Sequence, residues 1–213
     1  LPDNVSTLEG ALIEPLSVGL HAALQGNAHI GQTAIIMGAG CIGLVTLLAL
    51  KAMGVSRVVV IDVLESRLNK ALELGADYVI NGRQKDVIKE IMDYTGGVGC
   101  DLGIETAGSQ ITTTQLIKAA KKGSTIVLVG YSTSGEMSLP VGMLLDKELT
   151  IKTVFRYRNI YPIAIEAIAS GKIDIKRIVS HFYEFDEIQE ALDACIDNKE
   201  EVVKAIICIN TGK

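Results

Sequence analysis

The sequence lacks an apolar run long enough to cross a membrane. The stretch LVTLLALKAMGV (residues 44–55) is interrupted by Lys51 and is shorter than the roughly 18 residues that indicate a spanning helix. The first residues carry acids, and the basic segment that begins a signal peptide is missing. We therefore expect no membrane partner and no secretory leader.

Basic side chains form no stripe along the chain. The 20 Lys and Arg residues are outnumbered by 25 Asp and Glu residues, which gives a formal net charge of −5. The densest basic stretch, KAAKKGS (residues 118–124), is short and typical of a solvated helix end. Without a basic footprint, we expect no nucleic-acid partner.

Cysteine is scarce and scattered. Cys41, Cys100, Cys195 and Cys208 form no C-x-x-C pair and have no metal-ligand spacing. This pattern favours a reduced, cytoplasmic protein over a disulfide scaffold. We expect Cys195 and Cys208 to be small buried hydrophobes.

Apolar residues, in contrast, are plentiful. They make up 48% of the chain, with a mean hydropathy of +0.35, enough for a sizeable core. Short β-branched runs alternate with segments of helical periodicity, and the runs predict strands over residues 33–37, 57–62, 77–80, 101–106, 124–130 and 149–155. The runs are apolar almost throughout, as in strands covered on both faces. We predict an α/β protein with a Rossmann-type, doubly wound, six-stranded parallel sheet.

The two ends of the chain depart from this rhythm. Residues 1–15 contain Pro2 and Pro15 and are expected to hold no complete element. After Phe155, the pattern predicts helices over residues 161–170 and 186–198 and a last strand over residues 202–209. Since six strands are already assigned, this tail is expected to lie outside the main sheet.

A glycine-rich turn follows the first predicted strand. In MGAGCIGL (residues 37–44), Gly38, Gly40 and Gly43 have G-x-G-x-x-G spacing and precede a helix. In this context the glycines permit the turn, the approach of a pyrophosphate and the packing of helix on strand. The helix N-terminus would supply N–H groups for the phosphates. Spacing alone is weak evidence, because glycines mark many strand-to-helix turns.

Asp62 strengthens the nucleotide interpretation. It ends the second predicted strand, about 20 residues beyond the glycine turn, where an acid binds the adenosine ribose and favours NAD over NADP. The alternative is a helix N-cap, since DVLESRL begins a helix nearby. Arg67, one turn further on, is expected either to lie over the adenine or to pair with Glu73 or another surface acid.

Cys41 occupies a variable position of the glycine turn. A cysteine at a helix N-terminus can have a lowered pKa and raised reactivity. The other interpretation, which we favour, is a small residue tolerated beneath a cofactor.

Several stretches resemble the zinc-dependent medium-chain dehydrogenase/reductase family, and within it the sorbitol (polyol) dehydrogenases. The specific ones are EPLSVGLHA (residues 14–22) and VFRY (residues 154–157), with GAGCIGLVTLLALKAMG, VVVIDVLESRLNKALELGAD and VLVG between them. The resemblance covers essentially the whole chain. It implies a coenzyme domain inserted into a GroES-like catalytic domain, with residues 1–15 before the insertion, 16–157 as the NAD-binding domain and 158–213 as the returning segment.

The resemblance also implies roles for individual residues. Beyond the glycines it implies NAD contacts at Ile42, Asp62, Arg67, Val129, Gly130, Tyr131, Val154, Phe155 and Arg156. Arg156 and Tyr157 match positions that reach a polyol or a metal-bound water, although Arg156 could equally form a salt bridge across a domain junction. Glu14 would lie at the edge of a zinc site, bound to metal, water or substrate, and should be exposed here.

The zinc site itself is incomplete in this sequence. A catalytic zinc needs three protein ligands and an open position. His21, His29 and His181 are dispersed, and none makes a Cys/His/Glu set with Cys41 or Cys100. We expect zinc only in an intact parent enzyme, and no catalysis from this chain alone.

Several alternatives remain open at this stage. The chain could be the coenzyme domain of a threonine or butanediol dehydrogenase, or a nucleotide-binding module without catalysis. By resemblance, copies are expected to associate as a homodimer or higher oligomer through the edge strand LTIKTVF (residues 149–155).

Overall fold

The computed structural model describes residues 1–209 and contains a six-stranded parallel sheet with the order β3-β2-β1-β4-β5-β6. Its strands are β1 (Thr33–Met37), β2 (Arg57–Asp62), β3 (Tyr78–Asn81), β4 (Cys100–Glu105), β5 (Ala120–Leu128) and β6 (Thr150–Thr153). Each neighbouring pair is parallel, and β1 pairs with both β2 and β4. The predicted doubly wound sheet is therefore confirmed, with β6 at one edge.

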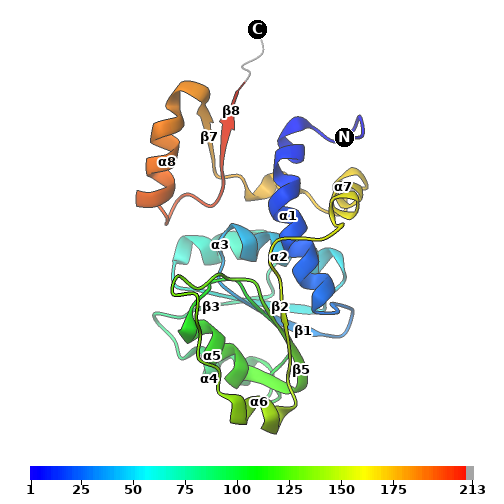
Figure 1. Cartoon of the computed structure of the whole chain (residues 1–213), viewed down its shortest axis with the longest axis vertical. Coiled ribbons are helices and arrows are strands. Elements are labelled where there is room, and N and C mark those ends of the chain that lie inside the picture. The colour runs from blue at the N-terminus through cyan, green and yellow to red at the C-terminus, as the bar shows by residue number, and fades with distance from the viewer. Residues whose placement is uncertain (210–213) are drawn as a thin grey trace.

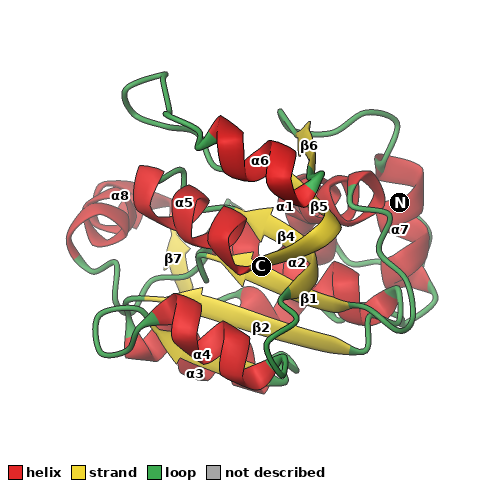
Figure 2. Ribbon diagram, turned by 90° about the horizontal axis from the view of Figure 1, so that it is seen from below, coloured by secondary structure: helices red, strands yellow, loops and turns green. Residues whose placement is uncertain are grey.

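Helices cover both faces of the sheet (Figures 1 and 2). One face carries α1 (Thr7–Gln25), α2 (Cys41–Ala52) and α3 (Glu65–Glu73), and the other carries α4 (Val87–Tyr94), α5 (Gln110–Ala119) and α6 (Val141–Lys147). Strand β1 shows why the central strands are mostly apolar: Ile36 packs with the first layer, whereas Ile35 and Met37 pack with the second.

Helix α1 begins earlier than the sequence pattern predicts. It starts at Thr7, so the expectation that residues 1–15 hold no complete element is wrong. Ser6 accepts from the N–H of Glu9, and the Glu9 carboxylate accepts from the N–H of Ser6, which closes a capping box. Pro15 lies inside this helix and has no N–H to donate to the carbonyl of Ala11. Because Ala11 is exposed, solvent can bind this carbonyl instead.

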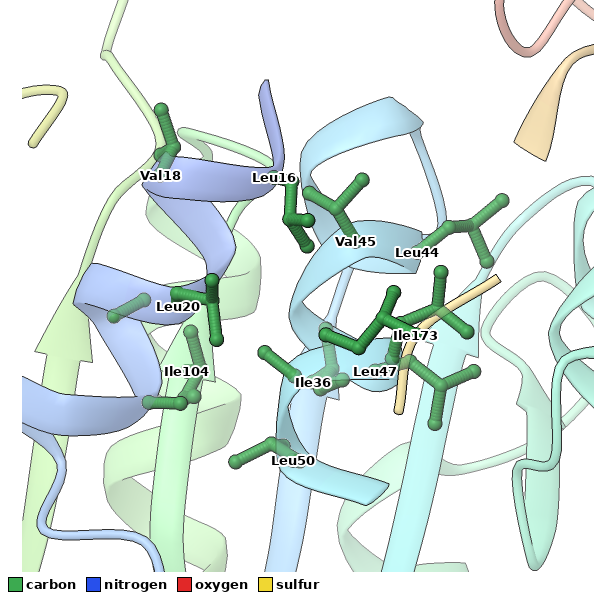
Figure 3. Packing of buried hydrophobic residues seen from close by; sticks show 14 of the residues in the cluster. Leu16, Val18, Leu20, Ile36, Leu44, Val45, Leu47, Leu50, Ile104 and Ile173 are labelled. Atoms are coloured by element: carbon green, nitrogen blue, oxygen red, sulfur yellow. The ribbon is translucent and has the colours of Figure 1, made fainter. Parts of the chain in front are cut away.

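Helices α1 and α2 cross at a glycine. A Cβ on Gly19 would stand 2.7 Å from the backbone nitrogen of Thr46 and 2.7 Å from the carbonyl carbon of Val45. Leu16 of α1 lies beside Val45 of α2 there, whereas Leu47 lies on the far side of α2 with Ile173 (Figure 3). The missing side chain thus allows the first helix to lie directly on the helix that follows the glycine turn.

The last part of the chain lies outside the main sheet, as expected. After α7 (Tyr161–Ala169) and the short 3₁₀ turn η1 (Ile175–Ile178) come β7 (His181–Glu184), a second 3₁₀ turn η2 (Phe185–Glu187), α8 (Ile188–Asp197) and β8 (Ala205–Cys208). Strands β7 and β8 pair in parallel. This unit projects from the body of the molecule (Figure 1).

The projecting unit leaves apolar side chains uncovered. Leu192 and Ile196 of α8 and Phe182 of β7 are each more than half exposed. Cys195, on the same helix, is exposed as well, which contradicts the prediction that it is buried. The reason is that nothing among the described residues packs on the outer face of α8. Cys208 is half-buried.

The helix crossing makes Gly19→Ala a sharp test of the fold. The added methyl group would collide with backbone atoms of α2, so we expect a loss of about 2 kcal/mol in the free energy of unfolding. Gly142→Ala in α6 is the matched control, because a Cβ there meets nothing within 4 Å. Urea denaturation of both variants measures the difference; equal midpoints would contradict the close crossing.

Candidate functional site

The predicted site residues gather at the carboxyl edge of the sheet. The glycine turn follows β1, Asp62 ends β2, Val129 and Gly130 follow β5, and Val154 follows β6. Because β1 pairs with both β2 and β4, the direction of winding reverses between β1 and β4. In open parallel sheets, ligands bind outside the carboxyl ends of the strands at this reversal point.

The three glycines of the turn differ in what the fold requires of them. Gly38 has φ +102, in the left-handed region that favours glycine. A Cβ on Gly43 would overlap the carbonyl oxygen of Gly38, so the first turn of α2 packs directly on the loop. A Cβ on Gly40 would meet only Arg67 Nη1, at 4.0 Å, which leaves open space over the N-terminus of α2. No side chain caps this terminus in the described chain, and Ile42 lies half-buried in its first turn.

Asp62 holds the glycine turn in place. Its side chain is 7% exposed, and Oδ2 accepts from the N–H of Ala39 at 2.7 Å. Oδ1 accepts from the N–H groups of Val63 at 2.7 Å and Leu64 at 3.0 Å. The N-cap of α3 is Leu64, so Asp62 lies two residues before the cap position. The carboxylate therefore positions the loop and still faces the carboxyl edge.

Arg67 contacts the α8–β8 loop, and not the acid suggested by the sequence. Its Nη2 donates to the carbonyl of Lys199 at 2.9 Å, while Glu73 pairs with Lys70. Ser66 donates to the neighbouring carbonyl of Glu200. The buried Nε of Arg67 has no acceptor within residues 1–209.

A cavity of about 430 Å³ lies beside this contact. Its walls come from the β2–α3 turn, the end of β3 and the α8–β8 loop, and are Val63, Leu64, Glu65, Ser66, Asn81, Arg83, Gln84, Glu200 and Glu201. The returning segment of the chain thus supplies one wall of the pocket next to Asp62.

Glu105 is a functional candidate that the sequence analysis missed. It ends β4 and is fully buried, and its Oε1 accepts from the N–H of Ala107 at 3.0 Å and from Thr112 Oγ1 at 2.8 Å. Oε2 accepts from the N–H of Gly108 at 3.0 Å. Its own carbonyl accepts from the N–H groups of Val129 and Gly130. Glu105 therefore organises the loops after β4 and β5 together.

The loop after β5 presents Tyr131 to solvent. A Cβ on Gly130 would stand 2.7 Å from Glu105 Oε2, so only glycine fits beside the buried carboxylate. Gly108 lies against the backbone of Tyr131, which joins the two loops. The Tyr131 side chain is 81% exposed at the edge where the strands end.

The segment after β6 is held by helix α1. Val154 is buried and its N–H donates to the carbonyl of Leu128 at 2.9 Å. Phe155 and Arg156 are exposed, with the guanidinium carbon 5.2 Å from the Phe155 ring centroid. The backbone of Arg156 has φ +77, and its carbonyl accepts from Nδ1 of His21 at 3.2 Å. No salt bridge involving Arg156 is present in the described chain.

Glu14 is exposed, as predicted, and lies near two candidate groups. Its negative charge contributes to raising the pKa of both Cys41 and Tyr161, behind larger effects in each case. Tyr161 donates to the hydroxyl of Tyr157 at 3.1 Å, and this bond is the main reason that the pKa of Tyr161 is raised to about 12. Tyr157 and Tyr161 therefore form a hydroxyl pair near the Glu14 carboxylate.

Cys41 fits the unreactive interpretation. Burial raises the pKa of its thiol, and the positive charge of Lys204 opposes that shift only in part. The thiol is therefore not activated by its position at the helix N-terminus. Lys204, the residue before β8, is therefore close enough to the glycine turn for its charge to act on this thiol.

The residues present do not fit a zinc ion. Within residues 1–209, no three His, Cys, Asp or Glu side chains come together as a ligand set. His29 bonds locally to the carbonyl of Asn27, and His181 to Ser180. The described helices also include none that is long and apolar enough to span a bilayer.

A family model described as zinc-binding dehydrogenase matches residues 41–170, more than half of the chain. The chain belongs to the zinc-binding dehydrogenase family. The match begins with the first residue of α2 and ends one residue beyond α7, so it covers the glycine turn only in part and includes every later strand of the main sheet.

Individual members of the zinc-binding dehydrogenase family are similar over nearly the whole chain. An uncharacterized zinc-type alcohol dehydrogenase-like protein of Escherichia coli is 44% identical over 99% of the chain, and the sorbitol dehydrogenase of Bacillus subtilis is 37% identical over 99%. The chain spans about 60% of the length of each.

Solved structures agree with this placement. An Escherichia coli oxidoreductase/dehydrogenase of unknown specificity has a TM-score of 0.93 at 43% identity, and covers 99% of this chain with 60% of its own. An Escherichia coli alcohol dehydrogenase complexed with NADH has a TM-score of 0.91 at 26% identity, covering 98% of this chain with 61% of its own.

The buried carboxylate of Glu105 yields a testable prediction. In Glu105→Gln an amide NH₂ would face backbone N–H donors, so we expect the free energy of unfolding to fall by about 2 kcal/mol. Glu73→Gln is the control, because its carboxylate is 62% exposed and its ion pair with Lys70 should contribute less than about 1 kcal/mol. Urea midpoints compare the two, and an unchanged midpoint for Glu105→Gln would rule out its role as loop anchor.

Proposed function

We propose that the chain is the NAD-binding part of a zinc-type polyol dehydrogenase. The observation that carries the proposal is the open space over Gly40 at the N-terminus of α2, bordered by Asp62. A pyrophosphate fits there because it needs backbone N–H groups and the positive end of a helix, with no side chain in the way.

The described residues suit each part of the dinucleotide. Gly38, Gly40, Ile42 and Gly43 would hold the pyrophosphate, and Asp62 would accept from the ribose hydroxyls with its remaining lone pairs. The adenine is assigned to the pocket beside the contact of Ser66 with Glu200, next to Arg67 in the chain.

The nicotinamide would lie toward the other strands. Val129, Gly130, Tyr131 and the segment Val154–Arg156 border that half of the carboxyl edge. When bound, NAD would supply the hydride acceptor for alcohol oxidation. The chain's own contribution is to hold the dinucleotide with its nicotinamide facing Arg156 and Tyr157.

The reaction of the whole protein is a proposal as well, because the chain spans only about 60% of its relatives. We infer oxidation of a secondary alcohol such as sorbitol or xylitol. Arg156 would bind substrate oxygens by charge-assisted hydrogen bonds, and Tyr157 and Glu14 would border the same site. No step is assigned to zinc, since its ligand set is not found in residues 1–209.

Three further parts of the proposal come from the sequence. The division into residues 1–15, 16–157 and 158–213 is retained, although α1 runs continuously through the first boundary. A cytoplasmic location is expected, and copies would associate along β6, the edge strand of the sheet. The threonine and non-catalytic alternatives have no observation in their favour here. The butanediol alternative has one, since a butanediol dehydrogenase of Bacillus subtilis matches with a TM-score of 0.90 at 31% identity, but the sorbitol dehydrogenase of the same organism is more similar in sequence, at 37%.

Cofactor binding is tested by titrating the chain with NADH and NADPH. Unsubstituted chain should saturate with NADH and bind NADPH more weakly, because the Asp62 charge repels a 2′-phosphate. In Asp62→Asn, NADH affinity should fall about tenfold with loss of charged hydrogen bonds. The ratio of NADPH to NADH affinity should rise about tenfold.

Asp77→Asn is the matched control. The Asp77 carboxylate also accepts from a backbone N–H, that of Val58 at 2.7 Å, but at the opposite edge of the sheet. The Asp77→Asn substitution should leave the affinities for NADH and NADPH unchanged. Failure of the unsubstituted chain to bind NADH would refute the proposal.

A test of the substrate class requires a protein that has the full length of the relatives. We expect NAD reduction with sorbitol or xylitol at a higher kcat/KM than with threonine or 2,3-butanediol, measured by NADH absorbance. A higher kcat/KM with threonine or 2,3-butanediol would contradict the polyol proposal and support the corresponding alternative.

A further inference from the structure

We propose that His21 is a positioning residue for the nicotinamide side of the site. The inference rests on the proposed function and concerns a histidine for which the sequence indicated no metal-ligand set. His21 lies in the middle of α1, far from the glycine turn in sequence, and is 9% exposed.

Both ring nitrogens of His21 have partners. Nδ1 lies 3.2 Å from the carbonyl oxygen of Arg156, and because a carbonyl only accepts, Nδ1 carries the proton. Nε2 lies 3.2 Å from the side-chain nitrogen of Gln25, which donates to it in this tautomer. A buried histidine with two satisfied nitrogens has a fixed orientation.

The acceptor of this bond is an unusual piece of backbone. Arg156 has φ +77, which a non-glycine residue adopts only when its surroundings hold it there. The bond from His21 is one such restraint. It acts on the residue that follows Val154 and Phe155, in the segment that would border the nicotinamide.

A second bond ties the same two elements together. Lys152 of β6 donates through Nζ to the carbonyl of Gln25 at 2.8 Å. Lys152, Gln25, His21 and Arg156 are therefore linked by three successive hydrogen bonds that connect β6 and the segment after it to the last turns of α1. A cavity of about 480 Å³ borders this set and is lined by His21, Gln25, Thr153, Phe155, Arg156, Tyr157 and Arg158.

The experiment compares NADH with ADP-ribose, which has the same adenosine and phosphates but no nicotinamide. In His21→Leu, NADH affinity should fall about tenfold, as for the loss of one positioning hydrogen bond, while ADP-ribose affinity stays within about twofold. In His21→Asn, whose amide nitrogen stands near the place of Nδ1, NADH affinity should recover toward that of the unsubstituted chain. His29→Leu, at an exposed loop histidine, should change neither affinity.

Each result has one meaning. Equal weakening of both ligands in His21→Leu would show a general structural role and overturn the inference, as would no weakening at all. Equal loss in His21→Asn and His21→Leu would also overturn it. If the unsubstituted chain does not bind NADH, the proposed function fails and the inference with it, and that result is seen before any variant is made.

Discussion

Buried carboxylates that accept from backbone N–H groups determine the shape of the carboxyl edge. The loops after β1 and β4 are short and contain glycine, so few of their own side chains can stabilise their conformation. Asp62 binds the N–H of Ala39 inside the glycine turn, and Glu105 binds the N–H groups of Ala107 and Gly108. Because an ionised carboxylate only accepts, each one selects N–H groups and orients the loop that carries them. The surface offered to a ligand depends on these two anchors.

The main sheet was readable from the sequence because its central strands are mostly apolar and glycine follows several of the intervening helices. Strands β1 and β2 have the predicted bounds, and β4 differs by one residue at each end. Strand β5 begins earlier than predicted, at Ala120, since it pairs with Cys100 across an irregular register that no local pattern encodes. Glu105 could have been found by the signal that identified Asp62, an acid that ends an apolar strand.

Other parts could not be read from local pattern. Pro15 suggested a break, although the S-x-x-E spacing of Ser6 and Glu9 does signal the start of α1. The partner of His21 is a carbonyl 135 positions away, which no local periodicity can indicate. Arg67 likewise contacts a carbonyl of the α8–β8 loop instead of a nearby acid.

The glycine turn separates two kinds of evolutionary constraint. Gly43 is required by the fold, since any side chain there would strike the carbonyl of Gly38, whether or not a ligand is ever bound. Gly40 has an ordinary backbone conformation with open space around it, so only a ligand's need for that space forbids a larger residue. A descendant that had stopped binding nucleotides would be free to vary at Gly40 while still conserving Gly43. Loss of Gly40 with retention of Gly43 would then indicate that nucleotide binding had been lost while the fold was kept.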